Sequence, residues 1–138
     1  MSLTIEMNDT ELLKEIENCT FDTTLFTHNI MLRLSWILIQ KYGLKEATLK
    51  NCEIKETYYN NVLKNDKFNL PLTKAYTDIL HHFMEKSASP DNFEKLLSEF
   101  PRLKYNFKKL VKTHYGYNIL KEHRKEEPKG KRPILFNF

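Results

Sequence analysis

The chain has 138 residues, which is enough for one ordinary hydrophobic core and too few for two comfortable domains. Hydrophobic residues make up 41% of it, and 22 Lys and Arg outnumber 18 Asp and Glu. Only three glycines are present, so there is little material for the tight turns of an all-β fold. The composition therefore predicts a single all-α domain over residues 1–138, a bundle of five to six helices.

Two features bear on where the protein is found. The N-terminus lacks a basic segment followed by an apolar stretch and a small-residue cleavage site, so we expect a cytoplasmic protein. The most hydrophobic run, from Ile30 to Ile39, contains Arg33 and is far shorter than the roughly 20 residues that span a bilayer, so no membrane partner is expected.

Cys19 and Cys52 lack CxxC spacing and are expected to remain reduced and buried.

The first predicted helix lies within NDTELLKEIENC, residues 8–19. Asn8 or Asp9 is a candidate N-cap, and Glu11 stands three residues after Asn8, as in a capping box. Leu12, Leu13 and Ile16 share one side of this short amphipathic helix.

The second predicted helix runs from about residue 26 to 42 and is apolar on nearly every side, which predicts a central position. Gly43 is well placed to end it in the left-handed conformation. A long, less regular third helix is predicted over 44–64, where there is neither glycine nor proline.

Three further helices follow. Asn69 is expected to cap the fourth, with Pro71 in its first turn, and Ser89 to cap the fifth, with Pro90 at its first position. Pro101 opens the sixth, and Gly116 is expected to stop it. The basic tail, residues 117–138, ends in PILFNF and is expected to dock back on the body through these last residues.

Positive charge is concentrated near the C-terminus. Residues 102–132 carry eleven Lys or Arg against three Glu. On the sixth helix, Lys104, Lys108 and Lys112 recur every four residues and form a basic patch that could follow phosphates. Because there is no RNA- or DNA-binding motif and no aromatic stacking signature, an ordinary solvated helix face is favoured over a nucleic-acid surface.

The stretch FTHNIMLRLSW, residues 26–36, places His28, Arg33 and Trp36 within the apolar second helix. A buried guanidinium needs a partner, so Arg33 either forms an internal ion pair or binds an anionic ligand. Its candidate carboxylate partners are Asp22, Asp78 and Glu99. A histidine in such a place is more often a hydrogen-bonded core residue than a metal ligand.

Signatures of catalysis and of cofactor binding are absent from the sequence. It contains no GxSxG, HExxH, P-loop or Rossmann glycine pattern. His81 and His82 are adjacent and would point about 100° apart on a helix, so they do not form one metal site. Whether the protein is an enzyme stays open, and no cofactor is expected.

Residues 26–36 resemble the signature F-x-H-x-x-H-L-R-x-A-W of a family of small helical bacterial proteins whose function is not established. The likeness continues at 69–73, where the family has His-x-T-x-T, and at His114 and Tyr115. Met31 and Asn69 stand where the family has histidines, so His28 alone is kept. The resemblance thus implies where a site lies. It also implies that this chain is a relative that has lost metal or acid/base chemistry. No metal site is predicted.

These observations lead to one functional hypothesis and two alternatives. The hypothesis is a polar pocket that binds a small anionic or polar ligand. Its predicted residues are His28, Arg33, Trp36, Asn69 and Thr73. The first alternative is a protein-interaction or assembly module, including a homodimer, and the second is nucleic-acid binding through the basic C-terminal quarter.

Overall fold

The computed structural model describes residues 7–64 and 68–115, and within these ranges it contains seven α-helices and no strand. The helices are α1 (Asp9–Glu17), α2 (His28–Tyr42), α3 (Leu44–Tyr58), α4 (Leu70–Lys86), α5 (Phe93–Glu99), α6 (Arg102–Tyr105) and α7 (Phe107–Tyr115). The predicted all-α bundle is therefore confirmed. No helix in the described part of the chain is long and apolar enough to cross a membrane.

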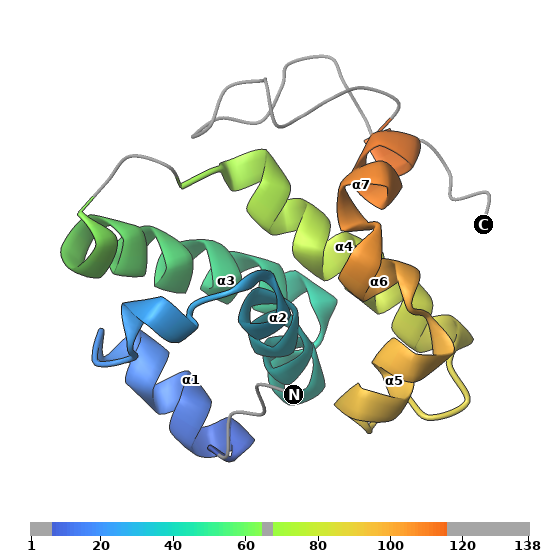
Figure 1. Ribbon diagram of the computed structural model, residues 1–138, viewed down its shortest axis with the longest axis horizontal. Coiled ribbons are helices and arrows are strands. Elements are labelled where there is room, and N and C mark those ends of the chain that lie inside the picture. Colours follow the sequence, from blue (N-terminus) through green and yellow to red (C-terminus); the bar gives the residue numbers. More distant parts are fainter. Residues whose placement is uncertain (1–6, 65–67, 116–138) are drawn as a thin grey trace.

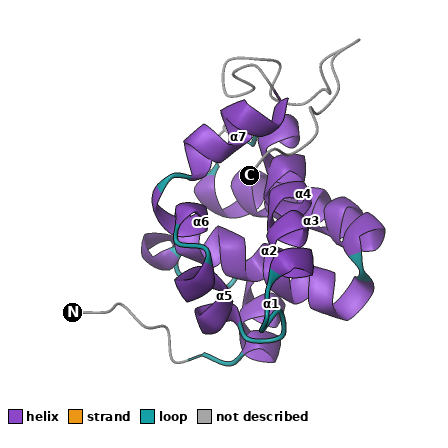
Figure 2. Cartoon of the chain, turned by 90° about the vertical axis from the view of Figure 1, so that its right-hand side faces the viewer, coloured by secondary structure: helices purple, strands orange, loops and turns teal. Residues whose placement is uncertain are grey.

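Helix α2 is the centre of the bundle, as its all-round apolar sequence predicts. It packs against α1, α3 and α4, and Figure 1 shows it end-on among them. The helices α1 and α7 lie at opposite ends of the molecule in both views (Figures 1 and 2). Helix α2 begins at His28, two residues later than predicted, because Thr27 acts as its N-cap.

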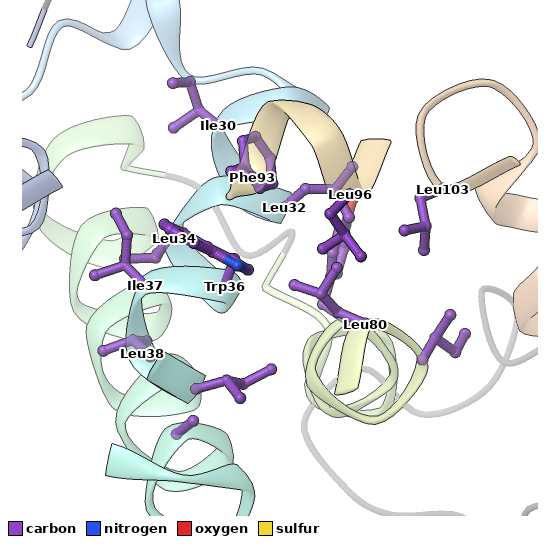
Figure 3. Close-up of a cluster of buried hydrophobic side chains, with 14 of the residues drawn as sticks. Ile30, Leu32, Leu34, Trp36, Ile37, Leu38, Leu80, Phe93, Leu96 and Leu103 are labelled. Atoms are coloured by element: carbon purple, nitrogen blue, oxygen red, sulfur yellow. The ribbon is translucent and has the colours of Figure 1, made fainter. Parts of the chain in front are cut away.

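The core joins side chains from α2 to three C-terminal helices (Figure 3). Leu32, Leu34 and Leu38 of α2 are fully buried, and so are Leu80 of α4 and Leu96 of α5. Burying each such side chain stabilises the fold by roughly 1.5–3 kcal/mol. Helix α2 is buried on nearly every side, which is why its continuous apolar sequence locates this core correctly.

Two predicted N-caps are confirmed. The Asn8 side chain accepts a hydrogen bond from the Glu11 backbone N–H at 2.8 Å and donates one to the Glu11 carboxylate at 2.8 Å. Asn69 Oδ1 accepts a hydrogen bond from the Leu72 N–H at 2.9 Å, and Pro71 lies in the first turn of α4. Both caps satisfy backbone donors that the helix itself leaves free.

Gly43 alone connects α2 to α3. Its φ of 83° is positive, as predicted, but its ψ of 169° is extended rather than left-handed helical. This combination is accessible essentially to glycine only. The residue is both the last cap of α2 and the first cap of α3, so the chain reverses with no intervening loop.

The predicted start of the fifth helix is wrong by three residues. Asn92, rather than Ser89, is the N-cap of α5, and its side chain accepts a hydrogen bond from the Lys95 N–H at 3.0 Å. Pro90 lies in the preceding turn, where its carbonyl accepts a hydrogen bond from the Trp36 indole. This tertiary contact holds Pro90 outside the helix.

Two other predicted helices are interrupted. The third is α-helical only to Tyr58 and continues as a π-helical turn over Tyr59–Leu63. The sixth breaks at Asn106, whose φ of −132° is not helical, and this break separates α6 from α7. Gly116 and the predicted docking of the tail, 117–138, lie outside the described residues.

Candidate functional site

A cavity of about 480 Å³ lies where the N-terminal ends of α2 and α4 meet the junction of α6 and α7. Among the described residues that line it, none is acidic and three are lysines. The lining residues are His28, Leu72, Tyr76, Lys104, Tyr105, Asn106, Phe107, Lys108 and Lys109. The break at Asn106 thus lies in the cavity wall, and the elements that form the wall come from three distant parts of the sequence.

His28 occupies the first turn of α2, and both of its ring nitrogens are engaged. Nε2 lies 3.0 Å from the Leu103 carbonyl oxygen, which can only accept, so Nε2 carries a proton and donates it. Nδ1 of the neutral ring is then an acceptor and receives a 2.6 Å hydrogen bond from the Tyr76 hydroxyl. Burial lowers the pKa of His28, the bond to Leu103 opposes this, and nearby Lys55 lowers it further. The ring is therefore neutral at pH 7.

Tyr76 forms the back of the cavity. Its ring stacks on Phe107, with centroids 4.5 Å apart and planes 22° apart, and its centroid lies 5.5 Å from that of His28. Burial raises the pKa of Tyr76, so the phenol keeps its proton. Because that proton is donated to His28, the phenol oxygen can still accept a hydrogen bond from a ligand.

Lys55 of α3 lies on the Tyr76 ring and was missed by the sequence analysis. The side chain is 1% exposed, and its Nζ lies 4.2 Å from the Tyr76 ring centroid. No hydrogen-bond acceptor reaches Nζ in the described part of the structure. Burial lowers the pKa of Lys55 to about 7, because an ammonium group without water or an acceptor around it is disfavoured.

A helical spacing in the sequence could have revealed this lysine. Lys55 follows Ala47 and Asn51 at four-residue steps and precedes Tyr58 by three, and all four residues are buried on one face of α3. Lysine at such a position ordinarily indicates a helix surface, and this expectation hid the signal.

Other buried polar groups lie close to Lys55 along α3. Asn51, one turn before it, donates a 2.9 Å hydrogen bond to Ser35 Oγ on α2, and Ser35 donates to the Met31 carbonyl at 2.9 Å. Thr48, nearly one turn earlier, shares a 2.9 Å hydrogen bond with Thr77 of α4. The interface of α2, α3 and α4 therefore contains a row of polar contacts within an otherwise apolar core.

The predicted basic patch is divided by the break between α6 and α7. Lys104 lies on α6, Lys108 on α7, and both line the cavity together with Lys109. Lys112 lies one turn beyond Lys108 and does not line it. All four side chains are exposed, so their charges face solvent and the cavity mouth.

Arg33 forms an internal ion pair, the first of the two readings of the sequence. Its Nε and Nη2 atoms donate to Asp9 Oδ1 at 3.0 and 2.9 Å, and Nη2 also donates to the Met7 carbonyl at 2.6 Å. The partner on α1 is none of the three carboxylates considered from sequence. Arg33 holds α1 against α2 and does not line the cavity.

The other predicted pocket residues do not gather around His28. Trp36 is buried and donates from its indole nitrogen to the Pro90 carbonyl at 2.9 Å. Asn69 caps α4, and buried Thr73 donates to the Asn69 carbonyl at 2.8 Å. Of the five residues proposed from sequence, His28 is the one that lines the cavity.

Metal-binding side chains are not grouped in the described ranges: no three His, Cys, Asp or Glu residues there lie close enough to hold an ion. His81 is paired with Glu85 on α4, at 3.0 Å from Nδ1 to Oε1. Met31, which replaces a histidine of the resembling family signature, packs partly buried against the core.

No protein-family model, curated protein or solved structure matches the chain.

Proposed function

We propose that the cavity binds a small molecule that carries an anionic group. The observation that supports this is the composition of the wall: Lys104, Lys108 and Lys109 meet the His28 and Tyr76 pair there, and no carboxylate lines the cavity in the part of the chain that the structure describes. Three ammonium groups that no acid of the described wall neutralises create a positive potential that attracts an anion and strengthens its hydrogen bonds.

The cavity also offers an apolar surface. Phe107 and Tyr76 stack on each other, and Leu72 completes this side of the wall. The volume of about 480 Å³ lies within the range of sites for small ligands. A ligand with an anionic group at the lysines and an apolar or aromatic body against these residues would use both surfaces.

Titration calorimetry with phenyl phosphate tests the proposal. We expect saturable binding at low ionic strength that weakens as salt is added, since the lysines are exposed and screened. The double substitution K108A/K109A should weaken binding at least tenfold. Lys45→Ala, on the exposed surface of α3, is the matched control and should leave binding unchanged.

Two results would contradict the proposal. One is equal affinity for phenyl phosphate and for uncharged benzyl alcohol, which would show that the anionic group is not recognised. The other is unchanged affinity in K108A/K109A, which would place any binding site elsewhere on the protein.

A further inference from the structure

We infer that the anionic ligand of this cavity is a nucleotide, with its phosphate at the cavity lysines and its base stacked on Tyr105. The inference rests on the proposed function and adds a second contact, a stacking surface, that a simple anion site would not need. Three observations on α6 and α7 support it.

The first observation is the exposure of Tyr105. Its relative exposure is 72%, higher than that of any other large hydrophobic side chain in the described residues, and yet it lines the cavity. The remaining exposed large hydrophobic residues reach at most 57%, at Leu49 on α3. An aromatic ring held in solvent at the mouth of a cavity has a free surface on which a flat ligand can stack.

The second observation is the charge around this ring. Residues 101–113 contain one arginine, four lysines and no acidic residue. Lys104 places its Nζ 5.5 Å from the centroid of the Tyr105 ring, and Lys108 and Lys109 follow within one turn of the break. An exposed aromatic ring beside cations is a combination by which proteins stack a base and hold its phosphate.

The third observation is Asn106, which follows Tyr105 in the chain and precedes Lys108 and Lys109. Asn106 is exposed and lines the cavity, and its backbone is not helical. Its amide offers a donor and an acceptor together, the pair of groups that recognises the edge of a base. A purely anionic ligand would leave this amide and the Tyr105 ring without a role.

The size of the cavity limits how much of a nucleic acid could enter. About 480 Å³ suits one nucleotide rather than several. The ligand is therefore either a free mononucleotide or one nucleotide of a single strand, and both present an anionic phosphate and a base.

The test compares AMP with ribose 5-phosphate, which carries the same phosphate without a base. We expect AMP to bind the wild-type protein roughly tenfold more tightly, in line with the contribution of one stacked base. Tyr105→Ala should reduce AMP affinity to that of ribose 5-phosphate, whereas Tyr105→Trp should preserve the difference. Because Tyr105 is exposed, circular dichroism of both variants should match that of the wild type.

The outcomes separate this inference from the proposed function. If ribose 5-phosphate and phenyl phosphate both fail to bind, the anion site itself is wrong and the inference falls with it. If both bind but AMP binds no more tightly, or Tyr105→Ala leaves the AMP advantage intact, only the nucleotide is wrong. With the AMP advantage established, tighter binding of a ten-residue oligothymidylate than of TMP identifies a single strand as the source, and the reverse identifies the free nucleotide.

Discussion

The Nζ atom of Lys55 lies 4.2 Å from the centroid of the Tyr76 ring, and the hydroxyl of the same ring lies 2.6 Å from Nδ1 of His28. One tyrosine thus joins an amine buried in α3 to an imidazole at the start of α2. The Tyr76 ring and the His28 imidazole both line the cavity. A change in the charge of Lys55 or His28 therefore changes the electrostatic potential at the cavity wall.

Lys55→Met is expected to stabilise the protein near pH 7. The pKa of Lys55 is about 7 in the folded protein and near 10.5 when unfolded, so between these values the unfolded chain holds more protons. The free energy of unfolding of the wild type should therefore rise by about 2 kcal/mol from pH 7 to pH 9. In Lys55→Met this rise should disappear. Urea denaturation at both pH values measures it.

Lys45→Met is the control for this experiment, because Lys45 lies on the same helix and is exposed. The pH range stops at 9, because burial also raises the pKa values of Tyr58, Tyr59 and Tyr76 and reverses the trend where unfolded tyrosines ionise. A rise of the same size in Lys55→Met would mean that another group causes it.

Tyr76→Phe is expected to lower the free energy of unfolding by about 1–3 kcal/mol, since it leaves Nδ1 of half-buried His28 without its donor. The pKa of His28 should rise, because the lost hydrogen bond favours the neutral ring. Nitrogen-detected NMR should show the proton on Nε2 in the wild type. Tyr42→Phe, at an exposed position, is the control.

The lowered pKa of His28 also predicts how stability responds to acid. The folded pKa lies below the unfolded value of 6.5, so the unfolded chain takes up the proton first. The stability that neutral His28 contributes is present above pH 6.5 and is lost as the pH falls from there towards the folded value. His28→Gln should show a weaker loss in urea denaturation over this range.

Arg33→Leu and Asp9→Asn, separately and together, test the ion pair between α1 and α2. Asp9 is half-exposed, with 47% of its side chain in solvent, so screening limits the coupling between the two groups to about 1 kcal/mol. Arg33→Leu alone should cost more, because it also removes the hydrogen bond to the Met7 carbonyl. Additive losses in the double variant would show that the pair contributes no coupling energy.

Asn92→Ala and Ser89→Ala test the position of the α5 cap. Asn92→Ala removes the acceptor for the Lys95 N–H and should lower the free energy of unfolding by about 1 kcal/mol. Ser89→Ala should stay within about 0.5 kcal/mol of the wild type, since Ser89 is not the cap. The opposite ranking in thermal denaturation would restore the cap predicted from sequence.

Helical periodicity was sufficient to predict the fold because the buried leucines and aromatics recur at regular spacing. It failed where tertiary contacts decide the backbone. Leu103, Phe107 and Leu110 continue one apolar stripe across Asn106, so nothing in the pattern marks the break between α6 and α7. In the same way, the indole of Trp36 engages Pro90 from a distant part of the chain.

The site was harder to predict because its groups meet only in three dimensions. His28, which was singled out by its polar character in an apolar helix, lines the cavity. Arg33, selected by the same argument, is paired with Asp9 on a helix that the sequence does not show to be adjacent. Lys55 and Tyr76 come together across the α3 and α4 interface, and no spacing between them in the sequence indicates it.

The single-residue connection at Gly43 makes the relative alignment of α2 and α3 sensitive to chain length. If α3 absorbed one residue added there, it would turn about its axis by about 100°, since each helical residue advances by that angle. Such a turn would carry Asn51 away from Ser35 and Lys55 away from Tyr76. The polar contacts within the core therefore depend on the alignment that this one-residue reversal sets, and a side chain at its positive φ would strain the reversal.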